Sequence, residues 1–571
     1  MTDRRRFIQT LAAAPLCWAM APALAAPDPA RVALVIGNAA YPRSPLLNPT
    51  HDAEAMQTLF ASAGFTTDHL LNARRADMLA AIDRFVAAIE KPGTRQAVFY
   101  YAGHGVQLDW RNYLLPVDIA VQASEDIKRQ CVDLGHLLGR LSKGQDKTFI
   151  VILDACRDDP FRGAYTPTHK GLSQFDAPAG SLLAYATAPG SVAADGTGQH
   201  GLYTEHLVRE FSNRQAKIED ALKRVRLGVR LGSDGAQIPW ETTSLESDVF
   251  LFPDGDKKLS EAELERQIEA EIALWTELKD SKKVDDWVAY LRQYPNGRFA
   301  EIAQARLGRL LAAAKSSPAA MPSPTPATAA STPLSGAASA PAPALILQAD
   351  QGMTLQVQAS GNPNSAGRYP LGRKFSLGDT AEYRHTDLLT GVVESTSRRR
   401  VTRVDEDNDR VELNDGGWIL DLMGNLVRHP RFGEMDVPQQ INPVELQIGY
   451  KWTAAWKQRH PKFGQQVVEL ALKISQFEPV SVPAGRFQAF RIEGRGWVMN
   501  QGVEIRDTYW VVPGFNFPVK SEHTRRRQGR LVRTERIELV SATQMTLGEV
   551  CTTTTGLGKT RNLMIHDQCG G

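Results

Sequence analysis

Apolar and amphipathic segments alternate along the first part of the chain, from about residue 31 to residue 253. Four short segments are continuously apolar and rich in β-branched or aromatic residues: 32–37, 97–101, 148–153 and 181–186. A helical pattern runs from Asp52 to Ala63, and Gly64 follows at the position typical of a helix end. Apolar strands separated by helices are typical of a parallel sheet covered on both faces. We therefore expect an α/β domain over residues 27–255.

The pattern changes after this domain. Residues 259–314 have apolar positions at helical spacing, interrupted by a Tyr-Pro-Asn-Gly turn, which predicts a helical hairpin packed on the first domain or bridging to the next. Residues 315–345 are almost wholly Ala, Pro, Ser and Thr and are predicted to be a disordered linker. Residues 346–545 alternate Thr, Val, Arg and aromatic residues between Gly- and Asn-rich turns, which indicates an antiparallel sheet or open barrel. Residues 546–571 form a polar tail.

Residues 1–25 have the pattern of an export signal. Arg4–Arg6 precede Phe7 and Ile8, an apolar stretch follows, and the small residues Ala23-Leu24-Ala25 end it. Paired arginines before x-Phe-Ile resemble a twin-arginine signal. An uncleaved membrane anchor is disfavoured because the stretch is short and rich in Ala and Pro. We expect a periplasmic or secreted protein with no transmembrane span.

Composition limits the classes of function. The 571 residues contain 66 basic and 64 acidic side chains, so no charge excess indicates a nucleic acid or a membrane surface as partner. Four cysteines follow the signal, at positions 131, 156, 551 and 569. They are too few for a disulfide framework and lack the C-x-x-C spacing of a zinc site. Cys551 and Cys569 lie in the polar tail and are candidates for a disulfide.

Two reactive side chains follow two of the predicted strands. His104 stands between two glycines just after the second strand, and Cys156 follows the third. Sites in parallel sheets form outside the carboxyl ends of the strands, so we expect both side chains on one rim. A lone histidine is usually structural, and a buried cysteine usually acts as a small apolar residue. The interpretation of Cys156 as a small apolar residue is weakened because Cys156 stands in a turn among charged residues.

The region from Arg31 to about Pro253 resembles the caspase/metacaspase superfamily, and most of all its bacterial caspase-like peptidases. The segments that carry the resemblance are RVALVIGNAAY, LLNPTHDAEAM, VFYYAGHG, RNYLLP and DACRDDP. His104 and Cys156 are separated by about 50 residues, the interval found in caspase-type peptidases. The resemblance implies a caspase-like parallel sheet flanked by helices, followed by the helical segment, the linker and the β-rich domain.

The same resemblance implies a cysteine endopeptidase acting on proteins or peptides. Cys156 would be the nucleophile, and His104 would take the thiol proton and return one to the leaving amine. The N–H groups of Gly105 and Cys156 would form the oxyanion hole. The residues indicate no metal or other cofactor. Metacaspases often need calcium, but no D-x-[DN]-x-[DN]-G loop is present, so calcium stays open without support from the sequence.

One departure from the caspase pattern predicts specificity. Caspases have Gln-Ala-Cys at the nucleophile, whereas Asp154 stands here in place of the Gln. A carboxylate at the pocket floor would repel an acidic substrate residue and attract Arg or Lys, as in the similar metacaspases. Asp52 resembles the second acidic residue of that pocket, although an acid favoured by the helix dipole is nearly as good an interpretation. We expect cleavage after Arg or Lys.

Two other interpretations of function stay open. The first domain would then be a caspase-like scaffold with an unused Cys–His pair, or the C-terminal domain would carry the main function by binding a cell-envelope ligand. The basic runs 398–400 and 525–527 are the candidate polymer contacts, although such runs are usually solvated strand faces. In the loop after Cys156, Arg162 and Lys170 are candidate sites of autocleavage.

Overall fold

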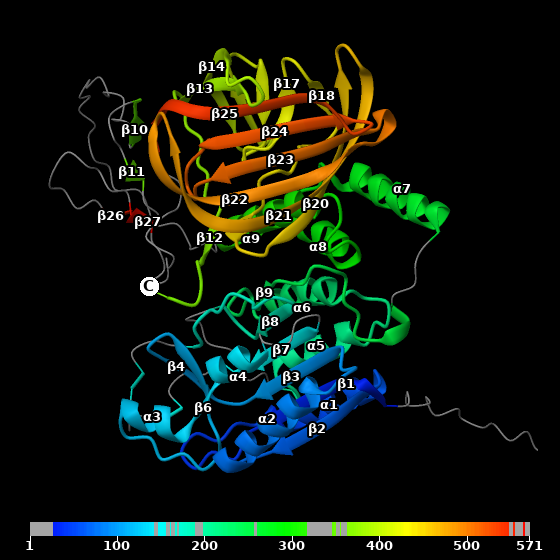
Figure 1. Cartoon of the computed structure of the whole chain (residues 1–571), viewed down its shortest axis with the longest axis vertical. Coiled ribbons are helices and arrows are strands. Elements are labelled where there is room, and N and C mark those ends of the chain that lie inside the picture. The colour runs from blue at the N-terminus through cyan, green and yellow to red at the C-terminus, as the bar shows by residue number, and fades with distance from the viewer. Residues whose placement is uncertain are drawn as a thin grey trace, which may run out of the picture.

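The computed structural model describes residues 27–141, 147–155, 160–161, 166–167, 171–188, 198–255, 260–316, 345–349, 354–355, 362–546, 552–553 and 564–565. Figure 1 shows two bodies stacked along the long axis of the molecule, an α/β domain and a large curved sheet, with helices between them. The predicted export signal, nearly all of the linker and most of the tail lie outside the described residues. Cys156 lies outside them as well.

A six-stranded sheet forms the centre of the α/β domain, with the strand order β2-β1-β3-β7-β8-β9. Its strands are β1 (Asp28–Gly37), β2 (Phe65–Leu71), β3 (Gln96–Ala102), β7 (Thr148–Asp154), β8 (Ser181–Tyr185) and β9 (Trp240–Thr243). The first five are parallel, and β9 runs antiparallel to β8. Four of these strands were predicted from sequence. The other two form the edges of the sheet, where alternating burial leaves no continuous apolar run.

Helices cover both faces of this sheet, as predicted. They are α1 (Pro49–Ser62), α2 (Arg75–Glu90), α4 (Leu134–Leu141), α5 (Leu202–Phe211) and α6 (Ile218–Gly232). Helix α1 packs with α5 and α5 with α6, whereas α2 packs with α4. The right-handed crossovers through α1 and α2 run in opposite directions across the sheet, so these two helices lie on opposite faces. A small antiparallel sheet, β4 (Gly105–Leu108), β5 (Arg111–Leu114) and β6 (Val132–Asp133), and helix α3 (Ser124–Gln130) lie beyond the carboxyl end of β3.

The helical segment contains three described helices: α7 (Glu261–Leu278), α8 (Val284–Gln293) and α9 (Ala300–Ser316). The sequence predicted a hairpin of two, because the Lys- and Asp-rich turn between α7 and α8 carries no Gly or Pro to mark it. Trp275 stacks on Phe299 with ring centroids 4.7 Å apart and contacts Trp287, so the helices share one apolar core. That core is continuous with the curved sheet, while α8 also contacts α6. The segment therefore bridges the two bodies.

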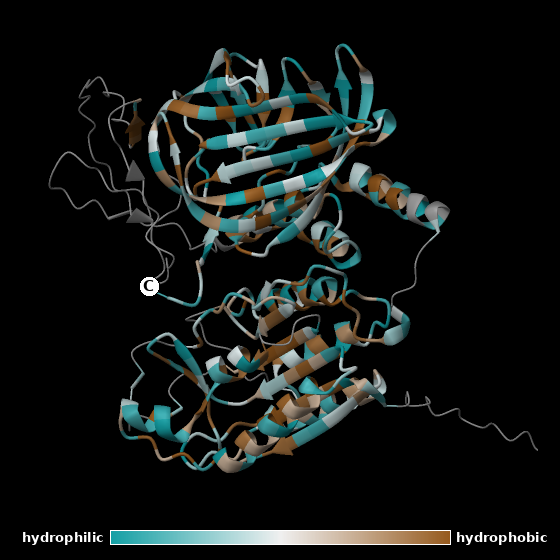
Figure 2. Cartoon of the chain, viewed as in Figure 1, coloured by the Kyte–Doolittle hydropathy of each residue, from teal (hydrophilic) through white to brown (hydrophobic). Residues whose placement is uncertain are grey.

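The C-terminal sheet closes on itself, where the sequence indicated an antiparallel sheet or an open barrel. Twelve described strands form the ring, because β25 pairs with both β13 and β24. In ring order they are β13 (Thr380–Asp387), β14 (Val393–Asp405), β15 (Arg410–Leu413), β16 (Trp418–Leu420), β17 (Leu426–His429), β18 (Gly433–Met435), β20 (Lys451–His460), β21 (Gly464–Val482), β22 (Gly485–Val498), β23 (Val503–Val511), β24 (Lys520–Arg527) and β25 (Arg530–Gln544). Figure 2 shows polar and apolar bands alternating along β22 to β25, as expected for strands with one buried face.

The C-terminal part docks on the edge strand β9. Strand β19 (Glu445–Gln447) pairs with β12 (Arg368–Pro370). The Gln447 amide donates to the main-chain oxygen of Glu241 at 3.2 Å, and Lys451 donates to that of Leu245. Gly449, at φ 87°, packs so closely on Thr243 that a Cβ would overlap its carbonyl oxygen. This approach requires glycine and covers the outer edge of the six-stranded sheet.

A second docking contact involves residues 362–366, which precede β12. The Asn362 amide donates to the Gln174 carbonyl at 2.6 Å and to the Ser173 hydroxyl at 3.1 Å. Asp176 accepts hydrogen bonds from the Ser365 hydroxyl at 2.7 Å and from the main-chain N–H of residue 366 at 3.1 Å. These contacts join the C-terminal part to the segment 171–177, which leads into β8.

None of the helices among the described residues combines the length and the apolar character needed to cross a membrane.

Candidate active site

The carboxyl ends of β3 and β7 lie side by side. Ala102 pairs with Asp154 in the parallel register, and the N–H of Gly103 donates to the carbonyl oxygen of Asp154 at 3.2 Å. His104 follows β3 by two residues, and Ala155 is the last described residue after β7. The sequence placed His104 and Cys156 on one rim. His104 lies on that rim. Ala155, the residue before Cys156, lies on the same rim and is the last residue described after β7.

The imidazole of His104 has a defined orientation. Its Nε2 lies 2.7 Å from the main-chain carbonyl oxygen of Ser44, and the ring packs against Tyr41 with centroids 4.5 Å apart. A carbonyl oxygen only accepts hydrogen bonds, so Nε2 carries the proton of the neutral ring. The lone pair then resides on Nδ1, which is the nitrogen able to accept a proton. The side chain is buried, at 1% exposure.

Two tyrosine hydroxyls hold the main chain of His104. The N–H of His104 donates to the Tyr41 hydroxyl at 3.0 Å, and the Tyr101 hydroxyl donates to the His104 carbonyl oxygen at 2.7 Å. The two hydroxyls lie 3.1 Å apart. Gly103 has φ 154°, and a Cβ there would lie 2.7 Å from both hydroxyl oxygens. The glycine before His104 is therefore required by the close approach of the tyrosine pair.

Gly105 begins the short strand β4 with its N–H directed out of the ladder. Gly105 is opposite Leu114, and the N–H of Leu115 donates to the carbonyl oxygen of His104 at 3.1 Å. In an antiparallel ladder, this bond identifies Gly105 and Leu114 as a non-hydrogen-bonded pair, whose N–H groups point away from each other's strands. A Cβ on Gly105 would lie 2.9 Å from Leu172 and 3.3 Å from the Cβ of Ala155. Only glycine fits between these neighbours without a shift.

Asp154 ends β7 as a buried carboxylate, at 3% exposure. Its Oδ2 accepts a hydrogen bond from the Thr204 hydroxyl on α5 at 2.8 Å. The Thr204 oxygen lies 2.6 Å from the hydroxyl of Tyr100. Burial raises the pKa of Tyr100, and the negative charges of Asp154 and Asp52 raise it further. Asp154 and Asp52, the two carboxylates selected from the sequence, therefore both raise the pKa of the Tyr100 hydroxyl.

Asp52 lies in the first turn of α1, so the helix-dipole interpretation applies to its position. It has a further set of contacts that this interpretation does not require. Oδ1 accepts from the N–H of Gly201 at 3.1 Å and lies 3.1 Å from Nδ1 of His200. These partners stand at the start of α5, one turn before Thr204. Both carboxylates thus face α5 on the same side of the sheet.

Several other candidate residues have structural roles or lie outside the described residues. Burial raises the pKa of the Cys131 thiol to about 12, which keeps it protonated. Two acidic side chains that the sequence did not assign to any site form local ion pairs: Asp126 with Arg129 on α3, and Asp133 with Arg111. No group of three His, Cys, Asp or Glu side chains with the spacing of a metal site occurs among the residues that the structure describes. Arg162, Lys170, Cys551 and Cys569 lie outside them.

Three residues that support the site were not predicted from the sequence. Tyr41 and Ser44 follow β1 and contact His104, and Thr204 contacts Asp154 from α5. The only signal was the position of Tyr41 and Ser44 after the carboxyl end of a central strand, where a site is expected. Thr204 gave no local signal, because 50 residues separate it from Asp154.

Comparison with known proteins agrees with this geometry. Residues 30–250 match the family model described as the caspase domain. This part of the chain is therefore a caspase-like domain of the cysteine-peptidase type. Two mammalian relatives are similar to it: the mouse "Mucosa-associated lymphoid tissue lymphoma translocation protein 1 homolog" and the human "Mucosa-associated lymphoid tissue lymphoma translocation protein 1". Each is 28% identical over 164 residues, which cover 28% of this chain and 19% of the relative. The chain thus matches about a fifth of the length of these relatives.

Proposed function

We propose that this protein is a cysteine endopeptidase that cleaves after Arg or Lys, with Cys156 as nucleophile and His104 as general acid and base. The observation that supports this proposal most directly is which ring nitrogen of His104 carries the proton. Its Nε2 proton is committed to the Ser44 carbonyl, which leaves Nδ1 to accept the thiol proton. The adjacent ends of β3 and β7 support the pairing with Cys156, which is the residue after Ala155.

The chemistry proceeds in two acyl-transfer steps. His104 takes the proton of the Cys156 thiol, the thiolate attacks the scissile carbonyl carbon, and the imidazolium returns that proton to the leaving amine. Water then hydrolyses the thioester with His104 as the base. The outward-directed N–H of Gly105, together with that of Cys156, stabilises the oxyanion; removing one such donor typically costs about 2.7–4 kcal/mol.

The acidic pair supports the choice of a cationic substrate residue. Asp154 and Asp52 direct two carboxylates toward α5 from the rim of the sheet, where an Arg or Lys side chain entering beside Thr204 would find opposite charge. An Arg or Lys side chain placed beside these two carboxylates would be attracted by both negative charges. The opposite preference, for an acidic residue, would place like charges together.

Reporter hydrolysis tests this proposal. Full-length wild type, Cys156→Ala and His104→Gln are assayed with arginyl, lysyl and aspartyl peptides that differ only in the residue before the scissile bond. We expect hydrolysis of the first two peptides by wild type alone, with all three chains unfolding at similar temperatures. Preference for the aspartyl peptide would refute the pocket assignment. If wild type hydrolyses none of the peptides, the domain would be a caspase-like scaffold. Hydrolysis that survives Cys156→Ala would refute Cys156 as the nucleophile.

We further propose that residues 1–25 export the protein as a folded chain to the periplasm or beyond. The twin-arginine pattern at Arg4 and Arg5 supports this. Replacing both by Lys should retain the uncleaved chain in the cytoplasm, which fractionation and N-terminal sequencing would detect. An unchanged periplasmic pool of processed protein would contradict the proposed route.

A further inference from the structure

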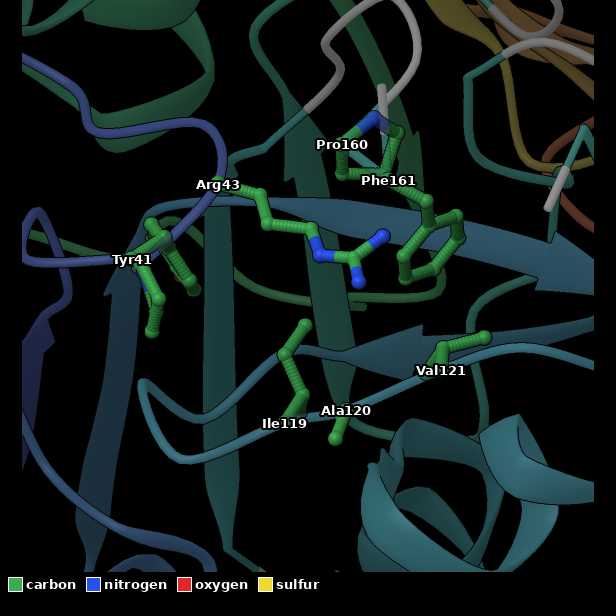
Figure 3. Close-up of a pocket in the computed structure, with 8 residues that line it drawn as sticks. Tyr41, Arg43, Ile119, Ala120, Val121, Pro160 and Phe161 are labelled. Atoms are coloured by element: carbon green, nitrogen blue, oxygen red, sulfur yellow. The ribbon is translucent and has the colours of Figure 1, made fainter. Parts of the chain in front are cut away.

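A pocket lies beside the candidate active site, and Figure 3 shows the side chains that line it. It is partly open to solvent. We call it the Arg43 pocket. It is lined by Tyr41, Pro42, Arg43, Ile119, Ala120, Val121, Pro160 and Phe161.

Three connections place the Arg43 pocket next to His104. The Tyr41 ring lines the pocket and packs on the imidazole. Ser44, the residue after Arg43, supplies the carbonyl that holds Nε2 of His104. Pro160 and Phe161 follow Cys156 by four and five residues. The pocket is thus separated from the candidate general acid by a single aromatic ring.

The pocket and the acidic pair lie on different sides of the sheet. Asp52 and Asp154 face α5, which packs with α1. The segment that forms the pocket floor, 119–121, continues from residues 117 and 118, which are hydrogen-bonded to Ala73 and Arg75 at the start of α2. A peptide whose cationic residue enters toward α5 therefore continues past His104 toward the α2 side.

The lining has one charged group over apolar walls. The guanidinium of Arg43 extends across the pocket toward Phe161 (Figure 3). Arg43 is exposed and makes no hydrogen bond or ion pair with any of the described residues. Ile119, Val121 and Phe161 give the walls an aliphatic and aromatic character. A group with a short apolar stem and a terminal carboxylate matches this lining, because a guanidinium binds a carboxylate through two parallel hydrogen bonds.

We propose that the Arg43 pocket is a substrate subsite for a carboxylate on the leaving-group side of the scissile bond. The inference rests on the proposed peptidase function. His104 returns its proton to the leaving amine, so the residues after the scissile bond pass over His104 and reach the Tyr41 ring first. The carboxylate belongs to a Glu or Asp in the first or second position after the bond, or to the free carboxyl end of a short substrate.

The experiment measures kcat/KM for a matched peptide series with Arg before the scissile bond. One arm places Glu, Gln or Lys in the first or second following position of an amidated peptide. The other arm compares a free with an amidated carboxyl end after a single Gly. The full chain is tested as wild type, Arg43→Gln and Arg43→Glu. The control is Arg95→Gln, which removes another exposed positive charge, paired with Asp28, at the amino end of β3.

Wild type should prefer Glu to Gln, or the free to the amidated end, by about tenfold. Arg43→Gln should remove the preference, Arg43→Glu should reverse it toward Lys, and Arg95→Gln should keep it. The preference should also shrink in 0.5 M salt, where screening weakens a partly exposed pair. A preference unchanged in Arg43→Gln, or absent from wild type while Cys156-dependent hydrolysis proceeds, would overturn the subsite alone.

A second readout separates the subsite from the peptidase reaction. The same Glu and Gln peptides are titrated into Cys156→Ala and Cys156→Ala/Arg43→Gln by calorimetry. Tighter binding of the Glu peptide only when Arg43 is present would support the subsite even if wild type hydrolyses nothing. Equal binding of both peptides by both chains would overturn it.

Discussion

The Tyr41 hydroxyl provides the sharpest test of how the site is held. Tyr41→Phe removes one oxygen atom and keeps the ring that packs on His104. The lost oxygen accepts the N–H of His104 at 3.0 Å and donates to the Leu115 carbonyl at 2.9 Å. The Tyr101 hydroxyl donates to the carbonyl oxygen of His104, so it holds the other side of this turn and not the N–H.

The magnitude follows from the burial of the groups that lose a partner. Tyr41 and His104 are 4% and 1% exposed, so water does not readily reach the orphaned N–H. A buried donor left without an acceptor costs about 1–3 kcal/mol. In a domain of this size, that cost lowers the unfolding temperature by about 2–12 °C. The main chain of His104 also relaxes, so we expect kcat/KM for an arginyl peptide to fall about tenfold or more.

Calorimetry and reporter hydrolysis check both expectations. Tyr113→Phe is the matched control, because Tyr113 lies in the same apolar cluster and its hydroxyl has no hydrogen-bond partner among the described residues. The control should unfold within about 1–2 °C of wild type and keep its activity. The reasoning is refuted if Tyr41→Phe behaves like Tyr113→Phe in both measurements.

Three further expectations concern other parts of the molecule. Burial lowers the pKa of His429 from 6.5 to about 3, so between pH 7 and pH 4.5 this histidine is protonated in the unfolded chain but not in the folded one. Wild type should therefore lose about 2–3 kcal/mol of unfolding free energy over this pH range. His429→Asn should reduce this pH dependence, measured by urea titrations followed by tryptophan fluorescence. Gly105→Ala should destabilise the first domain by about 1–3 kcal/mol and reduce peptide hydrolysis, whereas Gly139→Ala, where a Cβ meets nothing within 4 Å, should do neither. Asn362→Ala should speed amide exchange in residues 171–177 while exchange in the closed sheet stays unchanged.

Local patterns in the sequence were sufficient for the central strands and the rim. Strands β1, β3, β7 and β8 are buried on both faces, so each appears as a continuous apolar run. Parallel strands end at the same edge of a sheet, which is why the sequence alone assigns His104 to a rim. The glycines around His104 were also informative, because both positions exclude a Cβ.

Contacts between distant segments could not be predicted in this way. Closure of the C-terminal sheet depends on the pairing of β13 with β25, and Thr380 is separated from its partner Thr543 by more than 160 residues. The periodicity of each strand shows which face is buried but not which strand lies beside it. The same holds for the Gly201 amide that binds Asp52, and for the segment 362–366 that binds Asp176.

The charges at the domain junction show how the docking orientation is fixed. Arg226 on α6 pairs with Glu241 at 2.6 Å and with Glu445 at 3.7 Å, while Arg368 pairs with Glu445 and stacks on Trp240 at 3.9 Å. Each body contributes one cation and one anion to this cluster. Buried ion pairs repay little of their desolvation cost, and their net contribution to affinity is correspondingly small. Their geometry, however, admits few orientations. We infer that these ion pairs fix the orientation of the closed sheet against β9.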